Sequence, residues 1–513
     1  MTTAATPFAL PHWHRSVTMA GAIRAAAQRA PGKIAVKHGA ATRSFGDFND
    51  RIQRIANATV RDLKIPPGRT AAIIANNAIE YLEITTGVPE AGVPVATVST
   101  KLTPAEAAAV CDDAMAEVLF VDTTTAALAK AADFKTVRRV IQIGADFEGW
   151  LATQGGEIAR PDIDEWSTWT IPYTSGTTGR PKGVMLSHRA RLLNYAVKAQ
   201  EYGCFGVDDR FLSITPMNHG PGVGFPMNIL IFGGFVEVMD KFEPATVLRK
   251  LKHEGFTGIY TVPTHFHEFF QLDPAILDEC RRPPLRAIVS NSAPLTQAVK
   301  VKIVDYFGGG VLNELFSSTE QSLVANQRPA DQLRKPGSVG LPFAFVDVKI
   351  VGDDGRPCGI DDVGELFSRS PFLFSGYWNR PEETAAAFKD GWVTVGDMAK
   401  RDAEGYLTIV GRKKEMIITG GINVYPLEIE ELLLTHPAIA EAAVVGVPDP
   451  KWGEMVKAFV VLKPGAALTH AALAAHCASN LAAYKIPKAT EFLAALPRNL
   501  SGKVIKGELR APD

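Results

Sequence analysis

The chain has 513 residues, of which 46% are hydrophobic and 21% are charged, and its formal net charge is −1. This length allows roughly three compact units, and the composition is that of a globular protein, not of a disordered or collagen-like chain. Because the charges nearly cancel, there is no overall basic field to attract nucleic acid, and nucleic-acid binding is not expected.

The five cysteines are scattered and form no Cys-x-x-Cys pair, which argues against a zinc site or a disulfide framework. The N-terminus lacks the basic segment and long apolar stretch of a secretory signal. No apolar run is long enough to predict a membrane-spanning helix. We therefore expect a cytoplasmic protein without a transmembrane segment.

Residues 1–150 alternate helical and strand patterns. Hydrophobic residues recur at helical spacing from Phe48 to Leu63, and the apolar run 70–76 predicts a buried strand. A helix from Ala78, a strand at 93–100, a helix that opens at Thr103 and a strand at 117–122 follow. Such alternation, which continues to about residue 340, predicts an α/β fold with parallel sheets covered by helices.

From residue 346 to 410 short strands are separated by Gly, Asp and Pro turns, which predicts a small β-barrel-like subdomain at about 340–413. The last hundred residues predict a smaller α+β domain. Its elements are a Gly-Gly turn within 417–424, a helix at 427–434, strands at 441–447 and 457–464, and a helix at 469–483. We place the boundary in 411–415, between domains 1–413 and 414–513.

The most informative segment is Tyr173–Gly183, in which glycines and hydroxyl side chains precede two cations. Glycines let a backbone approach a ligand closely, and successive N–H groups and hydroxyls form a nest that fits a phosphate. The spacing differs from a Walker A loop, and strand-like sequence flanks both sides. A plain glycine-rich hairpin is the structural alternative, but it does not need so many hydroxyls and cations.

The loop resembles the signature of the adenylate-forming superfamily of acyl-CoA synthetases, aryl-CoA ligases, adenylation domains and firefly luciferase. The likeness extends from about residue 20 to 510, is greatest to a bacterial acyl-CoA ligase, and keeps the family's motifs in order. These motifs are Ser292–Leu295, Phe316–Glu320, Gly364–Leu366, Gly376–Pro381, Gly391–Asp397, Gly411–Glu415, Gly420–Pro426 and Pro497–Lys503. The resemblance implies a large N-terminal domain followed by a mobile C-terminal lid domain.

The resemblance also implies an acid–thiol ligase. A carboxylic acid and ATP would form an acyl-adenylate and pyrophosphate, and CoA would then take the acyl group, with Mg²⁺ as cofactor. Because a carboxylate must attack an anionic phosphate, cations and hydrogen-bond donors have to surround the phosphates. By resemblance, the residues that bind ATP or AMP are Thr174, Ser175, Gly176, Thr177, Thr178, Gly179, Lys182, Ser292, Ala293, Pro294, Phe316, Ser317, Ser318, Thr319, Asp397, Arg412 and Lys503.

Several of these residues have a more specific implied role. Thr319 would contact the α-phosphate, and Glu320 would ligate Mg²⁺, a hard cation that prefers oxygen ligands. Asp397 would accept hydrogen bonds from the ribose hydroxyls, with Arg412 beside it. Lys503 would bridge the attacking carboxylate and the α-phosphate. Together with His219, the residues Lys503, Thr319 and Glu320 form the implied catalytic set.

One departure from the family concerns adenine. Many relatives have Tyr-Gly where this chain has Phe316-Ser317. The Phe316 ring can still stack on a purine, but it donates no phenolic hydrogen bond. We therefore expect the adenine site to be kept with altered polar contacts.

The second half-reaction implies a hinge at Lys414, after which the Gly420-Gly421 loop would line the tunnel for the pantetheine arm. A plain hairpin turn is compatible with the same two glycines. His219 matches a position that gates this tunnel in relatives, although a structural role is the alternative. His265 and His267 would face one way on a strand, as metal ligands do, but no third ligand is evident, so packing or substrate lining is expected.

The acid is only partly defined by the sequence. Glycines 220, 222 and 224 leave space, and the expected acyl pocket suits a medium- to long-chain fatty acid or an aromatic acid better than acetate. Its residues are Met217, Asn218, His219, Val223, Gly224 and Phe225.

Two other functions stay open, namely an adenylating enzyme that loads a carrier protein and a non-catalytic nucleotide-binding module. The segment 219–225 lacks the acidic residue that pairs with an amino-acid substrate, and only ten residues follow Lys503, so a free-standing ligase is expected. The presence of Glu320, Asp397 and Lys503 argues against a decayed enzyme. The sequence leaves the particular acid and the oligomeric state open.

Overall fold

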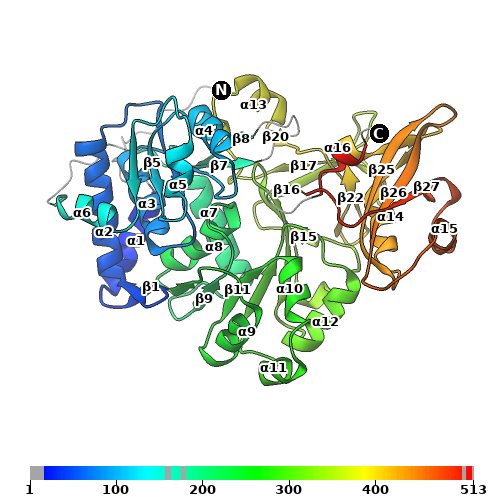
Figure 1. The fold of residues 1–513 in the computed structure, drawn as a ribbon, viewed down its shortest axis with the longest axis horizontal. Coiled ribbons are helices and arrows are strands. Elements are labelled where there is room, and N and C mark those ends of the chain that lie inside the picture. The colour runs from blue at the N-terminus through cyan, green and yellow to red at the C-terminus, as the bar shows by residue number, and fades with distance from the viewer. Residues whose placement is uncertain (1–16, 156–162, 175–180, 499–503, 511–513) are drawn as a thin grey trace, which may run out of the picture. The chain divides into compact units, whose positions relative to one another are not determined.

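A computed structural model of the protein describes residues 17–155, 163–174, 181–498 and 504–510 (Figure 1). The chain divides into two compact units. Unit 1 comprises Met1–Pro336, Pro342–Asp347 and Arg369–Val393. Unit 2 comprises Gly337–Leu341, Val348–Ser368 and Thr394–Asp513. The segment 411–415 therefore lies inside unit 2.

The first sheet of unit 1 has the strand order β18-β8-β7-β4-β3-β5-β6. Its parallel part confirms the strands expected from the apolar runs, and β3 is buried along its whole length. Two antiparallel strands, β8 and β18, extend this sheet at one edge. The strands are β3 (Thr70–Ile74), β4 (Val95–Thr97), β5 (Ala116–Val121), β6 (Arg139–Gln142), β7 (Thr168–Thr174), β8 (Lys182–Ser187) and β18 (Gly376–Tyr377).

The helices expected from Ala78 and from Thr103 are confirmed and begin at Ile79 and Pro104. Ser44 forms a capping box with Asp47 at the start of α2, and Thr103 forms one with Glu106 at the start of α4. Such boxes satisfy the first free N–H groups of a helix. The helical elements are α1 (Met19–Arg29), α2 (Phe45–Ala58), η2 (Thr59–Leu63), α3 (Ile79–Gly87), η3 (Pro89–Ala91), α4 (Pro104–Asp113), α5 (Ala126–Ala131) and α6 (Ala145–Ala152).

A second sheet of unit 1 contains the order β14-β13-β12-β11-β9-β10-β1-β2. Its inner strands are parallel, whereas β14 and β2 pair antiparallel with their neighbours. The strands are β1 (Ile34–His38), β2 (Ala41–Ser44), β9 (Arg210–Ser213), β10 (Phe235–Val238), β11 (Gly258–Thr261), β12 (Ala287–Ser290), β13 (Leu312–Ser318) and β14 (Ser322–Gln327).

Helices on this sheet bury a large apolar cluster that includes Leu248, Phe266 and Ile303. Because the carboxyl ends of parallel strands meet at one edge, the loops after β11, β12 and β13 lie together. The helices are α7 (His188–Tyr202), α8 (Gly220–Ile231), α9 (Pro244–His253), α10 (Pro263–Phe269), α11 (Pro274–Glu279) and α12 (Gln297–Phe307). Unit 1 also holds α13 (Pro381–Ala387) and the hairpin β19 (Phe388–Lys389) and β20 (Trp392–Val393).

The strand expected around His265 and His267 is wrong, because both residues lie on helix α10. Pro263 takes the first helical position, where its missing N–H costs nothing. Residues two apart on a helix point in different directions. The His265 ring is buried and stacks on Phe242 with 4.2 Å between centroids, whereas His267 is exposed. His265 therefore has the packing role that was the other expectation.

Unit 2 begins with the short strands that the turn-rich sequence predicts. They are β16 (Asp347–Val351), β17 (Gly364–Arg369), β21 (Asp397–Arg401) and β22 (Leu407–Arg412), and β17-β21-β22 form an antiparallel ladder. A further sheet has the order β24-β23-β26-β25, with β27 beside β26. The remaining elements are η5 (Lys413–Glu415), β23 (Ile417–Thr419), β24 (Ile422–Val424), α14 (Pro426–Leu433), β25 (Ile439–Asp449), β26 (Gly453–Leu462), α15 (His470–Ala478), η6 (Ala483–Lys485), β27 (Ala489–Phe492) and α16 (Lys506–Leu509).

Helix α15 is shorter than the helix expected at 469–483. The Ser479 hydroxyl donates to the carbonyl of Ala475, and the Asn480 amide donates to the carbonyl of His476. Such side-chain bonds to backbone carbonyls compete with the continuing helical ladder, and the helix ends at Ala478.

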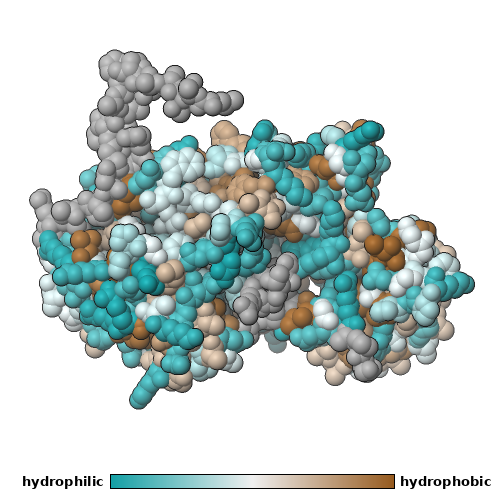
Figure 2. All heavy atoms as spheres, turned by 90° about the horizontal axis from the view of Figure 1, so that it is seen from above, coloured by the Kyte–Doolittle hydropathy of each residue, from teal (hydrophilic) through white to brown (hydrophobic). Residues whose placement is uncertain are grey.

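The surface has no extensive apolar belt on the face shown in Figure 2, where hydrophobic side chains form small separate patches. Within the described ranges, no helix is long and apolar enough to cross a membrane.

Candidate active site

The glycine- and hydroxyl-rich segment joins two antiparallel strands. Tyr173 pairs with Gly183, and Thr174 pairs with Lys182, at the ends of β7 and β8. A Cβ on Gly183 would lie 2.7 Å from Ile171 Cγ2, so only glycine allows the strands this approach. The strand-like flanks are thus confirmed. The intervening residues Ser175, Gly176, Thr177, Thr178 and Gly179 lie outside the described residues.

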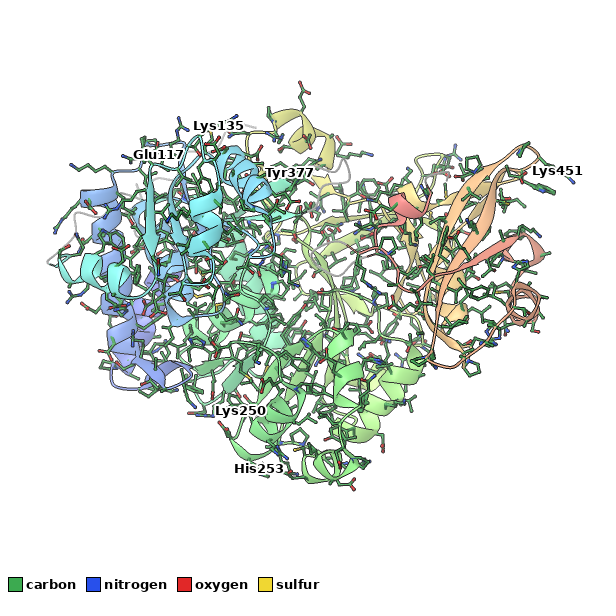
Figure 3. All side chains as sticks on the ribbon, in the orientation of Figure 1. Glu117, Lys135, Lys250, His253, Tyr377 and Lys451 are labelled. Atoms are coloured by element: carbon green, nitrogen blue, oxygen red, sulfur yellow. The ribbon has the colours of Figure 1, made fainter. Side chains whose placement is uncertain are left out.

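Lys182 stands at the centre of a charged group. Its ammonium forms an ion pair with Glu383 on α13, and its Nζ atom lies 5.3 Å from the centroid of the Tyr377 ring. Strand β18 brings Tyr377, which is labelled in Figure 3, beside β8, because Tyr377 pairs with Val184. Two segments almost 200 positions apart in sequence therefore supply one polar surface.

Tyr377 connects this lysine to the expected metal ligand. Its hydroxyl donates to Glu320 Oε1 at 2.9 Å. Burial of the ring, together with the charge of Glu320, raises the pKa of Tyr377, so the phenol keeps its proton and remains a donor. The sequence assigned no role to Tyr377, although it lies within the Gly376–Pro381 motif.

Glu320 sits at the tip of the β13–β14 hairpin, next to Thr319. The hairpin tip is anchored, because the Glu320 carbonyl accepts from Phe374 N at 2.9 Å and buried Gln321 donates to the Val393 carbonyl at 3.1 Å. A fixed turn holds the Glu320 carboxylate in a defined place with little freedom to lose on binding.

Glu320 fits the requirements of a Mg²⁺ ligand. Its carboxylate is half-buried, and Tyr377 uses one of several acceptor positions on its oxygens. Among the residues that the structure describes, no group of three or more His, Cys, Asp or Glu side chains could hold a metal by themselves. A single carboxylate is nevertheless compatible with Mg²⁺, which usually keeps several waters and binds substrate phosphates.

A second polar network borders the β7–β8 hairpin and was missed in the sequence. The Tyr173 hydroxyl donates to Asp113 Oδ2 at 2.8 Å, and the same carboxylate pairs with Arg380. Burial and the Asp113 charge raise the pKa of Tyr173, so this phenol also stays protonated. Arg380 stands in the Gly376–Pro381 motif, which is the signal that could have identified it.

Several residues expected to bind ATP or AMP, including the pair Phe316-Ser317 expected at adenine, lie at the carboxyl ends of β12 and β13. Phe316 and Ser317 are the half-buried last part of β13, and Asn291, just past β12, donates to Ser317 Oγ at 3.1 Å. Ser292 adopts a left-handed φ of 80°, and its Oγ atom lies 3.1 Å from the Tyr260 hydroxyl. Ser318 belongs to the same strand end, and Ala293 and Pro294 are exposed.

Unit 2, taken by itself, carries three further residues of the expected site, Asp397, Arg412 and Lys414. Asp397 and Arg412 face each other across β21 and β22, and Arg412 Nε donates to Asp397 Oδ1 at 3.1 Å. Asp397 is 6% exposed. Lys414 follows in η5, where burial and the charge of Arg412 lower its pKa. Lys503 lies outside the described residues.

The Gly420-Gly421 segment forms the turn between β23 and β24, with φ of 57° and 79°. The Gly420 N–H donates to the Trp452 carbonyl at 2.8 Å, and a Cβ on Gly420 would lie 2.9 Å from the Trp452 ring. A Cβ on Gly421 would meet no atom within 4 Å. The two glycines share a backbone conformation, but only Gly420 is packed against a neighbour.

The expected acyl residues lie at and inside the start of α8. His219 is exposed at the N-cap, while Phe225 is buried and stacks on Tyr260 with 4.7 Å between centroids. Gly222 does not leave open space, because a Cβ there would lie 1.8 Å from the Pro216 carbonyl oxygen. Its small size permits backbone packing instead. Buried around these positions are Met217, Asn218, Val223 and Gly224.

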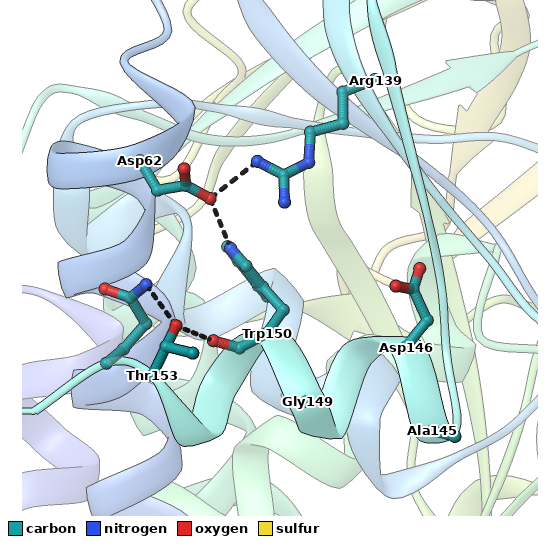
Figure 4. A pocket seen from close by; sticks show the side chains of 8 residues that line it. Asp62, Arg139, Ala145, Asp146, Gly149, Trp150 and Thr153 are labelled. Atoms are coloured by element: carbon teal, nitrogen blue, oxygen red, sulfur yellow. Dashed lines mark hydrogen bonds and ion pairs between the residues drawn. The ribbon is translucent and has the colours of Figure 1, made fainter.

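A hollow elsewhere in unit 1, lined by residues of η2, β6 and α6, holds none of the expected site residues (Figure 4). Two carboxylates line it. Asp62 accepts from Trp150 Nε1 and from Arg139, each at 2.7 Å, and Asp146 accepts from Gln142 N at 3.1 Å. The Trp150 hydrogen bond is the main cause that lowers the pKa of Asp62. The carboxylates of the hollow therefore already have hydrogen-bond donors within the chain, and the hollow is not the candidate site.

Known proteins match the chain along almost its whole length. The family described as AMP-binding enzyme matches residues 23–378, and the AMP-binding enzyme C-terminal domain matches residues 428–503. Feruloyl-CoA synthase from Amycolatopsis sp is 33% identical over 492 residues, covering 94% of this chain and 96% of that protein. The 2-succinylbenzoate–CoA ligase of Geobacillus kaustophilus is 31% identical and covers 96% and 98%. The crystal structure of ATP-bound MatB from Rhodopseudomonas palustris has a TM-score of 0.86, 29% identity and coverage of 96% and 98%.

Proposed function

The chain belongs to the AMP-binding enzyme family and is an AMP-forming acid–thiol ligase, and we propose that it converts a carboxylic acid with an apolar, preferably aromatic, skeleton to its CoA thioester. The observation that carries the proposal is the Lys182–Tyr377–Glu320 group beside the β7–β8 hairpin. It joins a phosphate-binding cation to a metal-binding carboxylate through a protonated phenol.

In the first half-reaction the substrate carboxylate attacks the α-phosphate of ATP, a P–O bond forms, and pyrophosphate leaves. We assign the β- and γ-phosphates to Lys182, Thr174 and the loop Ser175–Gly179. Thr319 contacts the α-phosphate, and Lys503 bridges it to the attacking carboxylate. When bound at Glu320, Mg²⁺ neutralises charge on the phosphates. Removing one preorganised stabiliser of such charge typically costs about 3–4 kcal/mol in the barrier.

Tyr377 is a positioning residue in this scheme. Its hydroxyl holds one oxygen of Glu320, which leaves the other oxygen for the metal. The ring also limits where the Lys182 ammonium can lie, at 5.3 Å from its centroid. A single side chain thereby fixes two charged groups before ATP arrives.

Asp397 and Phe316 are proposed to bind the nucleoside. Arg412 Nε donates to one Asp397 oxygen, and a carboxylate is an acceptor that suits the two ribose hydroxyls. The half-buried Phe316 ring provides a stacking surface for adenine, next to Ser292 and Ser317.

In the second half-reaction the CoA thiol attacks the acyl carbonyl, and AMP leaves. We propose a hinge at Lys414 between domains 1–413 and 414–513, a pantetheine path along Gly420 and Gly421, and a gate at His219. The exposure of His219 and the open space above Gly421 support these assignments.

The acid is proposed to lie against α8. Phe225 and Tyr260 present stacked rings at 4.7 Å, and Tyr260 reaches Ser292 on the nucleotide side. Aromatic rings favour offset stacking on one another, which supports an aryl acid over a saturated chain. The wall of the site is completed by Met217, Asn218, Val223 and Gly224.

The test is a panel of aryl and fatty acids incubated with ATP, Mg²⁺ and either CoA or a phosphopantetheinylated carrier protein. We expect AMP and pyrophosphate in equal amounts, with thioester formed on CoA. ADP as the product would refute adenylation, and acylation of the carrier protein alone would favour the carrier-loading alternative. Absence of any acid-dependent pyrophosphate exchange would favour the non-catalytic module.

A further inference from the structure

Helix α7 carries two cations on one face that lack a carboxylate partner among the described residues. Arg191 and Lys198 are seven positions apart, or two helical turns, and therefore share a face. The Arg191 guanidinium donates to Ser322 Oγ at 3.0 Å, but its Nε atom is buried without a hydrogen bond. Lys198 is 5% exposed, and its Nζ atom lies between the rings of Tyr195 at 4.6 Å and Phe225 at 4.4 Å.

The arrangement is costly for a group that serves packing alone. Leaving a cation buried without an anion costs more free energy than a desolvated cation–π contact contributes. The Arg191 guanidinium cannot avoid the cost of burial by losing its proton. Burial, and then the charge of Arg191, lower the pKa of Lys198 well below its usual value.

Another buried lysine of the same unit shows the usual solution. Lys300, 2% exposed on α12, forms an ion pair with Glu314 and donates to Gln327 Oε1 at 2.6 Å. The chain thus supplies an internal anion where a buried cation is structural. No such carboxylate faces Lys198 in the described parts of the chain.

Unpartnered neutral groups lie around the same position. Tyr195 OH and Asn194 Oδ1 on α7 are buried without a hydrogen bond. On α8, Asn228 is fully buried, and neither its amide nitrogen nor its oxygen has a partner. Asn228 lies one turn from Gly224, where a Cβ would come within 3.6 Å of Tyr195 OH, so this face of α8 is turned toward α7.

This cluster adjoins the proposed acyl site. Phe225, whose ring is 4.4 Å from Lys198 Nζ, stacks on Tyr260, and Tyr260 reaches Ser292 at 3.1 Å. We propose that the acid activated by this enzyme carries a second anionic group, a carboxylate or a sulfonate, at the end remote from the activated carboxyl. Lys198 and Arg191 supply its countercharge, and Tyr195 and Asn228 donate hydrogen bonds to it. This inference rests on the proposed function and narrows its substrate class.

The test compares pairs of acids that share a skeleton. One pair is 3-phenylpropanoate and 3-(4-carboxyphenyl)propanoate, and the neutral methyl ester of the ring carboxyl matches the second acid in size. A parallel series uses octanoate and octanedioate. We expect the wild-type enzyme to show at least a tenfold higher kcat/KM in pyrophosphate exchange for the preferred dianion than for its monoanion or ester.

Lys198→Met keeps the length of the side chain and removes its charge. We expect it to lower the ratio of dianion to monoanion kcat/KM at least tenfold, with partial recovery of the ratio in Lys198→Arg. Arg189→Met is the matched control, since Arg189 lies on the same helix but pairs with Glu165 inside the chain. If Lys198→Met does not fold, the same ratio of dianion to monoanion kcat/KM is compared between Arg191→Gln and the wild-type enzyme.

Two results would overturn the inference, namely a wild-type preference for the monoanion or the ester, and an unchanged ratio in folded Lys198→Met. Exchange with monoanions would still occur in both cases, so the proposed function would stand. A failure of the proposed function looks different, because no acid of either series would then support exchange.

Discussion

Replacing Gly421 by leucine should separate the two half-reactions. Gly421 has a φ of 79°, a left-handed conformation that costs a residue with a side chain about 1–2 kcal/mol. A Cβ there meets no atom within 4 Å, so steric overlap adds nothing in this structure. The expected loss of unfolding free energy is therefore about 1–2 kcal/mol, which lowers Tm by only a few degrees.

The catalytic effect should be larger and confined to one step. If the pantetheine arm passes this turn, a branched side chain blocks it, and thioester formation should fall a hundredfold or more. That loss corresponds to about 2.7 kcal/mol in the barrier. Adenylate formation does not use the arm, so pyrophosphate exchange should stay within a few-fold of wild type.

Gly465→Leu is the matched control. Gly465 has a φ of 76°, and a Cβ there also meets no atom within 4 Å. It follows the far end of β26, whereas the Gly420-Gly421 turn lies by the near end, where Thr419 pairs with Gly453. Lys451, labelled in Figure 3, marks this near end. A strand of ten residues separates the two turns by roughly 30 Å.

The assay measures pyrophosphate exchange and thioester production in one preparation, with a melting curve for each variant. Selective loss of the thioester in Gly421→Leu, with both activities kept in Gly465→Leu, supports the proposed path. Retention of both activities in Gly421→Leu would mean that the arm runs elsewhere. Equal loss of both activities in Gly421→Leu would indicate strain in the domain and would also refute the expected selective effect.

Three further predictions concern other parts of the chain. Lys503→Ala should abolish adenylate formation but spare thioester formation from synthetic acyl-AMP, and equal loss in both assays would contradict its role. Tyr377→Phe removes a hydrogen bond to a charged group, worth about 1.5–3 kcal/mol, and should slow adenylation roughly ten- to a hundredfold with unchanged use of synthetic acyl-AMP. Burial lowers the pKa of His188 to about 3 and that of His265 to about 4, so their folded forms stay neutral. Their contribution to the free energy of unfolding is fully present above about pH 6.5, the pKa of an unfolded histidine. Below that pH only the unfolded chain binds the proton, so the free energy of unfolding falls by about 1.4 kcal/mol per pH unit for each group as the pH falls toward 4. Urea unfolding of wild type and His188→Gln at pH 7.5 and 5.5 should show the smaller loss in the variant.

The local structure of the chain was predictable wherever short-range signals agreed. Thr103 and Pro104 marked a helix start, because a capping hydroxyl and a fixed φ act within one turn. The Gly420-Gly421 pair marked a turn, because its left-handed φ values exclude most other residues. The order of motifs gave the family, as the matches at 23–378 and 428–503 confirm.

Errors arose where the sequence left two local solutions open. The segment around His265 is too short for the spacing of its apolar residues to distinguish a strand from a helix. In the structure it is a helix, and the His265 ring packs on Phe242. The glycine at 222 suggested space, but a missing side chain equally allows a close backbone approach, and the Pro216 carbonyl occupies that position.

The sequence by itself determined the family, several of the helices and strands, and the residue types that the chemistry needs. The tertiary structure decided which of them meet. Lys182, Glu320 and Tyr377 come from three distant segments and join only because β18 pairs with β8 and Phe374 holds the Glu320 turn. The sequence, with 55 Asp and Glu residues, likewise does not reveal that Lys198 has no carboxylate partner among the described residues. Short-range preferences act within a few residues, whereas the partner of a buried charge is set by the packing of whole helices and sheets.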